Sequence, residues 1–271
     1  MYEEFYGLRE APFNITPDPR FLFFSDQHRE AFNHVLFGIR ERKGFIQLTG
    51  EVGAGKTTVC RAILTELGEK CRTALILNPT MTAPQLYRAI LVELGVKPRR
   101  ADKAAYLEQL NAYLLSQVSE GNDVVLFIDE AQDLDFELLE QIRLLSNLET
   151  DRRKLLQIVL IGQPELRQKL DDRSLRQLRQ RITVRFHLRP LSREDTERYI
   201  AHRLRVAGAD NGRPHFTSWA IRTVHRYSGG VPRLINAVCD KALLFGYVNG
   251  TQELPARAVR LAIRELEGKV A

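Results

Sequence analysis

The sequence of 271 residues predicts an α/β protein, in which a five-stranded parallel sheet is followed by a small all-helical domain. Three observations predict this fold. Short apolar segments alternate with helical patterns between residues 45 and 188, as in parallel sheets whose crossover helices cover both faces. Val124–Ile128 is apolar throughout, which is typical of a strand buried on both sides. After Pro190 only helical patterns continue.

The first 44 residues are expected to pack on the core. Residues 1–24 are rich in aromatic residues and proline, and proline prevents long helices there. Because this segment is so rich in aromatic residues, it is expected to pack against the core of the protein. Ser25 is then expected to cap a helix over residues 28–40, whose apolar side faces inward.

Strands and helices are expected to alternate through the core. The predicted strands are 45–49, 73–78, 124–128, 155–162 and 183–188. The helices between them are expected at 56–67, 84–94, 104–119, 136–148 and from Pro164 onward. We therefore expect three layers, with the sheet between two layers of helices.

The helical domain is expected to begin near Pro190. Ser192 is expected to cap its first helix, which runs to about Val206, and three helices follow at 218–227, 231–248 and 256–267. The predicted domains are therefore an N-terminal segment (1–44), a core (45–190) and a helical domain (191–271).

Composition limits the class of protein. No apolar run is long enough for a membrane-spanning helix, and Met1–Phe5 lacks the basic residues of a signal peptide, so we expect a soluble cytoplasmic protein. The 3 cysteines have spacings that fit neither a zinc site nor a disulfide framework. The net charge of +6 permits contact with nucleic acid or an anionic membrane without requiring either.

Residues 50–57 match the pattern G-x-x-x-x-G-K-[ST] of a phosphate-binding loop. Glycines let backbone N–H groups wrap the phosphates, and the following helix presents its positive end to the same anion. Lys56 is expected to reach the β- and γ-phosphates, and the Thr57 hydroxyl to bind Mg²⁺. The predicted ATP-binding residues of this segment are Gly50, Glu51, Val52, Gly53, Ala54, Gly55, Lys56, Thr57 and Thr58.

Two acids end the apolar strand 124–128. Ligands of parallel sheets bind at the carboxyl ends of the strands, where Asp129 and Glu130 are expected to lie. Asp129 is expected to hold Mg²⁺ and its water, and Glu130 to orient and deprotonate the attacking water. Glu130, an acid directly after Asp129, favours ATP hydrolysis over transfer of phosphate to another substrate.

Gln163 follows the strand 155–162 and is a candidate for contact with the γ-phosphate or the attacking water. The alternative is that it only caps the turn before Pro164.

The order of these motifs along nearly the whole chain resembles that of AAA+ ATPases, which share the P-loop NTPase fold. More narrowly, the sequence resembles the ATPase module of the general secretion pathway protein A family, with relatives in pilus biogenesis and at exosortase loci. The matching segments are 5–8, 12–13, 16–21, 28–31, 44–58, 128–132, 160–166 and 229–233.

The resemblance implies an oligomer with ATP sites between subunits, each completed by an arginine from the neighbour. Arg181 fits best, with Arg176 and Arg179 as alternatives; they could instead be solvated or pair with nearby acids. The resemblance also implies that Arg233 contacts the nucleotide from the helical lid, and that the N-terminal segment covers the adenine.

Three functions remain open, and one of them is a regulatory switch that binds ATP but hydrolyses it slowly. The first is an ATPase that powers or regulates assembly of an envelope secretion, pilus or exopolysaccharide system, with a partner at the inner membrane. The alternative is a DNA-binding ATPase that regulates transposition, which the basic residues 173–205 allow and the absence of a recognisable DNA-reading motif disfavours. Longer family members continue into a transmembrane helix and a peptidoglycan-binding domain, so the resemblance covers their ATPase module.

Overall fold

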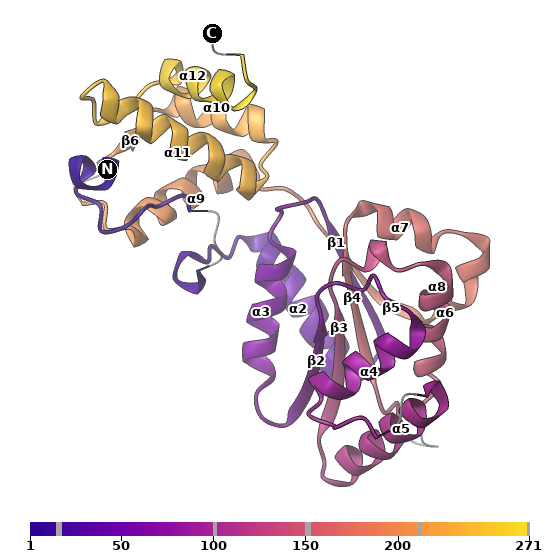
Figure 1. Cartoon of the computed structure of the whole chain (residues 1–271). Coiled ribbons are helices and arrows are strands. Elements are labelled where there is room, and N and C mark those ends of the chain that lie inside the picture. The colour runs from indigo at the N-terminus through magenta and orange to yellow at the C-terminus, as the bar shows by residue number, and fades with distance from the viewer. Residues whose placement is uncertain (15–17, 100–101, 150–152, 211–212, 270–271) are drawn as a thin grey trace. The chain divides into compact units, whose positions relative to one another are not determined.

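The computed structural model describes the chain except residues 15–17, 100–101, 150–152, 211–212 and 270–271. Its residues group into two units (Figure 1). The α/β unit comprises Gln27–Gly50 and Lys56–Leu188, and the helical unit comprises Met1–Asp26, Glu51–Gly55 and Arg189–Ala271. The predicted division into 1–44, 45–190 and 191–271 stays a prediction. Thr16 and Pro17, in a matching segment, lie outside the described residues.

The α/β unit contains the predicted five-stranded parallel sheet. Its strand order is β2-β3-β4-β1-β5, and each neighbouring pair is parallel. This order requires a crossover after every strand, which explains the helical segments between strands. The strands are β1 (Phe45–Gly50), β2 (Cys71–Ile76), β3 (Asp123–Ile128), β4 (Gln157–Gly162) and β5 (Ile182–Leu188).

Helices cover both faces of the sheet (Figure 1). Alternate residues of β3 and β4, such as Leu126 and Leu160, share a core with the helices that follow β2, β3 and β4. The opposite face is covered in part by α2, where a Cβ on Gly38 would lie 2.8 Å from the Ile46 side chain. The helices of this unit are α2 (Asp26–Arg40), α3 (Lys56–Leu67), α4 (Ala83–Glu93), α5 (Lys103–Ser119), α6 (Phe136–Leu145), α7 (Pro164–Leu170) and α8 (Arg176–Arg181).

The strand order brings three chain turns to one edge of the sheet. Strands β3, β4 and β1 are neighbours, with Ile128 beside Leu160 and Thr49 beside Gly162. Because the strands are parallel, the residues that follow Ile128, Gly162 and Gly50 leave the sheet at the same edge.

The helical unit is built from both ends of the chain. Aromatic residues near the N-terminus, such as Tyr6, Phe13 and Phe21, share a core with the C-terminal helices. The buried guanidinium of Arg203 donates hydrogen bonds to the carbonyl oxygens of Pro12 and Asn14 and lies over the Phe21 ring. The helices are α1 (Tyr2–Tyr6), α9 (Arg193–Val206), α10 (Ser218–Ser228), α11 (Pro232–Val248) and α12 (Ala256–Leu266).

The helical unit also contains a short parallel pair, β6 (His215–Phe216) and β7 (Glu253–Leu254), which the expected all-helical domain lacked. Each strand has 2 residues, too few to produce a strand pattern in the sequence. Among the described residues, no helix combines the length and apolarity needed to span a membrane.

Candidate functional site

The predicted phosphate loop joins the end of β1 to the start of α3. Gly53 and Gly55 have φ angles of 76° and 101°, which other residues adopt only with strain. Gly50 lies so close to β5 that a Cβ would stand 2.7 Å from the Leu188 carbonyl oxygen. The glycines of the motif are therefore required by the backbone path itself.

Lys56 opens α3 and is 7% exposed. Its Nζ donates a hydrogen bond of 2.7 Å to the carbonyl oxygen of Gly50, across the base of the loop. The ammonium group is thus held at the phosphate loop, where an incoming phosphate would find it. Beside it, Thr57 is exposed and Thr58 is half-buried.

The loop residues Glu51–Gly55 group with the helical unit. Glu51 and Val52 are exposed, whereas Ala54 is buried and its N–H donates to the carbonyl oxygen of Glu51. A Cβ on Gly53 would lie 2.6 Å from the Cβ of Arg233. Arg233 therefore packs against the loop, while its contact with nucleotide stays a prediction.

The two predicted magnesium ligands meet. The Thr57 hydroxyl donates a 3.2 Å hydrogen bond to Asp129 Oδ2, and Asp129 Oδ1 accepts one from the N–H of Glu130. Asp129 is 6% exposed, and this burial raises the pKa of its carboxyl above the ordinary value. A divalent cation fits here because both groups are oxygen ligands and because its charge would offset the burial of the carboxylate.

Glu130 has an unusual backbone conformation. Its φ of 51° and ψ of 38° lie in the left-handed region, which non-glycine residues rarely occupy. Such strain is concentrated at functional sites. The left-handed conformation begins the turn after β3 and places the Glu130 side chain toward the end of β4.

Two glutamines hold the Glu130 carboxylate. Oε2 accepts hydrogen bonds from Gln132 Nε2 at 2.7 Å and from Gln163 Nε2 at 3.2 Å. Gln132 Oε1 in turn accepts from the N–H of Gln163 at 3.0 Å, and a Cβ on Gly162 would intrude within 2.9 Å of that oxygen. The structure thus brings Gln163 to Glu130, while its contact with the γ-phosphate or the attacking water stays a prediction.

Gln132 has no assigned role in the sequence prediction. It lies within the matching segment 128–132, but no chemical pattern marks a glutamine two residues after an acid. Its place in the site depends on the left-handed backbone of Glu130, which the sequence does not reveal.

Two of the three predicted arginines of α8 are engaged within the α/β unit. Arg181 Nη1 donates to the Ser146 hydroxyl and, at 3.5 Å, to the carbonyl oxygen of Arg143. Arg179 forms an ion pair with Asp171 at 3.2 Å, whereas Arg176 is exposed. A role for any of them in a neighbouring subunit stays a prediction.

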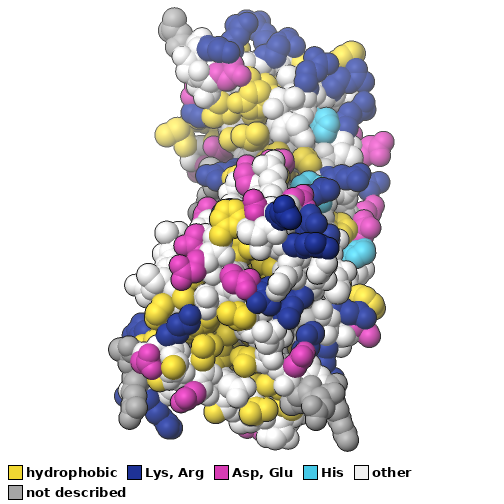
Figure 2. Space-filling view, turned by 90° about the vertical axis from the view of Figure 1, so that its right-hand side faces the viewer, with side chains coloured by type: hydrophobic (Ala, Val, Ile, Leu, Met, Phe, Trp, Pro, Cys, Tyr) yellow, Lys and Arg dark blue, Asp and Glu magenta, His cyan; other side chains and the backbone are white. Residues whose placement is uncertain are grey.

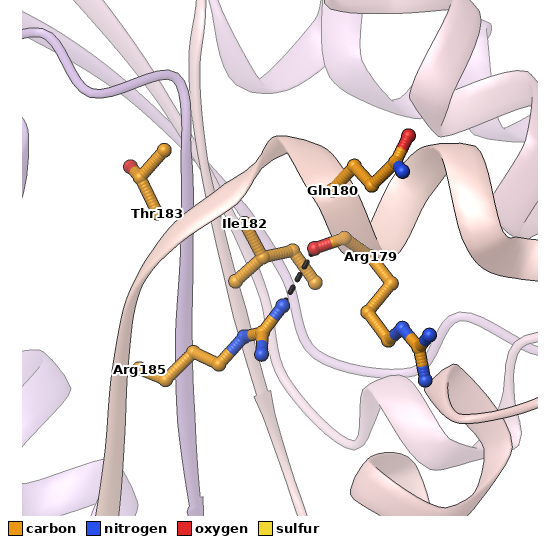
Figure 3. A pocket seen from close by; sticks show the side chains of 5 residues that line it. All are labelled: Arg179, Gln180, Ile182, Thr183 and Arg185. Carbon is orange, nitrogen blue, oxygen red and sulfur yellow. Dashed lines mark hydrogen bonds between the residues drawn. The ribbon is translucent and has the colours of Figure 1, made fainter.

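An open pocket of about 450 Å³ lies beside these arginines, lined by Arg179, Gln180, Ile182, Thr183 and Arg185 (Figure 3). In this pocket Arg185 Nη2 donates a hydrogen bond of 2.6 Å to the carbonyl oxygen of Arg179. None of the predicted phosphate-binding residues lines this pocket.

Residues 39–170 match the AAA domain family. The chain is 46% identical over 269 residues to general secretion pathway protein A of Aeromonas hydrophila. That match covers 99% of the chain and 49% of the relative, so the chain spans about half of that protein's length.

Solved structures with this fold belong to proteins of low sequence identity. The Aeropyrum pernix ORC2 protein has a TM-score of 0.66 at 16% identity, over 97% of this chain and 72% of that one. Drosophila ORC bound to DNA has a TM-score of 0.72 at 18% identity, over 94% and 64%. The RuvB motor of Thermotoga maritima has a TM-score of 0.58 at 17% identity, over 88% and 69%. At these identities the likeness shows the fold alone.

Proposed function

With residues 39–170 an AAA domain and nearly the whole chain related to general secretion pathway protein A, we propose that the protein binds Mg-ATP and hydrolyses it. One observation carries the proposal: the Thr57 hydroxyl and the buried Asp129 carboxylate lie together beside the phosphate loop. A buried acid with raised pKa is costly unless a cation accompanies it. Metal-nucleotide binding explains why the fold retains it.

Binding of ATP replaces contacts inside the loop. The Lys56 ammonium exchanges the Gly50 carbonyl oxygen for phosphate oxygens, and loop N–H groups donate to the same phosphates. Thr57 and Asp129 would hold Mg²⁺, which would neutralise charge on the β- and γ-phosphates. These residues position the triphosphate and supply no covalent chemistry.

Hydrolysis depends on Glu130. Its carboxylate orients the attacking water and accepts a proton from it, while Gln163 contacts the γ-phosphate or that water. In this structure Glu130 Oε2 accepts hydrogen bonds from Gln132 and Gln163, which compete with water for that oxygen. Arg181 completes the site from a neighbouring subunit by stabilising the charge that develops in the transition state.

The name of the relative supports the secretion part of the biological role that we propose. We propose that the protein is a cytoplasmic homo-oligomer that powers or regulates assembly of an envelope secretion, pilus or exopolysaccharide system. Its partner would lie at the inner membrane. Hydrolysis would then couple to the helical unit through Arg233, which packs against the phosphate loop.

Two substitutions test the chemistry. Lys56→Ala should abolish both the rise in melting temperature caused by Mg-ATP and phosphate release. Glu130→Gln should keep the rise and lower the turnover roughly 10²- to 10⁴-fold, the usual contribution of a general base. Asp133→Asn, at an exposed position three residues after Glu130, serves as the matched control. Phosphate release by Glu130→Gln at the parent rate would refute the assignment of the base.

A further inference from the structure

The solvent faces of α10 and α12 carry arginines at matching positions. On α10, Trp219, Arg222 and Arg226 follow a spacing of three and four residues, and all are exposed. The same spacing recurs on α12, whose three residues are also exposed arginines. Residues so spaced lie on one side of a helix. We name the set the arginine face: Trp219, Arg222, Arg226, Arg257, Arg260 and Arg264.

The two helices form one surface. Each buries its other side in the core of the helical unit, through residues such as Val224 on α10 and Val259 on α12. They also pack against one another, as Figure 1 shows. The arginine face is therefore two helices wide, and neither helix projects from the unit alone.

The charge of the arginine face is not compensated within the unit. Helix α10 has no acidic residue, and Glu265, the acid of α12, already pairs with Lys241 of α11. Within the described part of the chain, none of the five arginines has an acidic side chain at ion-pair distance. Lys and Arg side chains gather over the upper part of Figure 2, which shows the helical unit.

Like charges three and four residues apart on a helix repel one another. Arg257, Arg260 and Arg264 are so placed, and Arg222 and Arg226 likewise. An external array of anionic groups would relieve this repulsion, and guanidinium groups bind phosphate oxygens in pairs.

Trp219 adds an apolar group to this basic surface. The indole is 67% exposed, and the guanidinium carbon of Arg222 lies 4.6 Å from the ring centroid. Tryptophan is enriched at membrane–water interfaces, where its ring sits at the level of the headgroups beside basic side chains.

We propose that the arginine face docks the protein directly onto an anionic phospholipid surface. Arginines bind the headgroup phosphates, and Trp219 enters the interface. A surface of lipids suits a face two helices wide, whereas the DNA major groove admits a single helix. The proposal does not rest on ATP hydrolysis, because the face is complete without nucleotide.

The sequence contains a single tryptophan, Trp219, so the intrinsic tryptophan fluorescence of the protein reports on this surface. The full chain without nucleotide is mixed with vesicles of phosphatidylcholine, alone or with phosphatidylglycerol. We expect a shift of the tryptophan emission to shorter wavelength, and co-sedimentation, with the anionic vesicles only. Added salt should weaken both effects.

The double variant R222E/R260E should bind the anionic vesicles at least roughly tenfold more weakly, since each basic residue near such a surface contributes about a factor of five. The control R88E/K97E makes the same change in net charge at exposed positions of the α/β unit and should bind like the parent. Circular dichroism and the Mg-ATP melting shift establish that each variant is folded. Trp219→Ala should weaken co-sedimentation with a smaller effect.

Three results would overturn the proposal. The parent protein does not bind anionic vesicles, or folded R222E/R260E binds them as well as the parent does. The third is binding of duplex DNA that R222E/R260E abolishes, with no vesicle binding by the parent; the face would then serve nucleic acid. None of these results bears on ATP turnover, which is measured separately.

Discussion

The predicted site of the α/β unit and the arginine face of the helical unit hold their charged side chains in opposite ways. In the α/β unit, Lys56, Asp129, Glu130 and Arg181 each have a hydrogen-bond partner within the same unit. On the arginine face of the helical unit, charges lie in solvent without ionic partners among the described residues.

This difference indicates that the charged side chains of the two regions respond to a ligand in different ways. A side chain that already has a partner must exchange it before it acts, so its activity can be controlled by whatever favours the exchange. A charge without a partner requires no exchange and responds only to the arrival of its ligand. The predictions below test this contrast in the α/β unit, from the largest expected effect to the smallest.

Arg181→Ala should lower ATP turnover by about 10³-fold, because an arginine supplied by a neighbour stabilises the charge of the transition state. Phosphate release by the isolated variant measures this. Mixing it with Glu130→Gln subunits should restore part of the activity, since some interfaces then combine an intact Glu130 with an intact Arg181. Arg179→Ala, which removes an exposed ion pair with Asp171, tests the alternative arginine and should stay near the parent rate. Mixtures that regain nothing would argue against a shared site.

Gln132→Ala should raise the basal turnover roughly three- to tenfold. The substitution removes a hydrogen bond of 2.7 Å that competes with water for the Glu130 carboxylate, and a typical net contribution of about 0.5–1.5 kcal/mol corresponds to an effect of this size. Steady-state kinetics should show the change in kcat, with KM for ATP nearly unaltered. Asp133→Asn, at the next position, should leave both parameters unchanged. A fall in kcat would mean that Gln132 positions Glu130 for catalysis and does not restrain it.

Asp129→Asn should raise the melting temperature of the protein by a few degrees at pH 7 without nucleotide or metal. Burial raises the pKa of Asp129 in the fold above its ordinary value of 3.8, so ionisation destabilises the folded state. The stability associated with the protonated form is lost as the pH rises from that ordinary value through the raised one. The difference between variant and parent should therefore vanish below about pH 4. Thermal denaturation across this pH range measures it, and a less stable variant at pH 7 would contradict the interpretation.

Sequence patterns predicted the α/β unit closely because strand and helix periods differ and turns follow known chemistry. The helix after the phosphate loop has its predicted bounds, Lys56–Leu67. The helix predicted at 136–148 ends at Leu145, where Ser146 adopts the cap position and its hydroxyl returns to the Arg143 carbonyl oxygen. Such a local bond stops a helix whose apolar pattern continues. Helix α1, with 5 residues, is too short to show a period.

Contacts within the candidate site could be predicted where motif chemistry specifies them. The meeting of Thr57 with Asp129 follows from parallel strands and loop spacing. The partners of Glu130 and Arg181 follow from side-chain directions in the folded chain, which no spacing encodes. The arginine face was also missed, because the basic excess was sought in residues 173–205, whereas this face lies on α10 and α12.

Arg203 shows how the helical unit must be handled in experiments. Its guanidinium is satisfied by Pro12 and Asn14, nearly two hundred residues earlier in the chain. A fragment cut to start at residue 191 would leave that buried cation without acceptors and would remove Phe13 and Phe21 from the core. The unit is discontinuous in the sequence, so a workable excision must fuse the leading segment to the trailing helices or retain the entire chain.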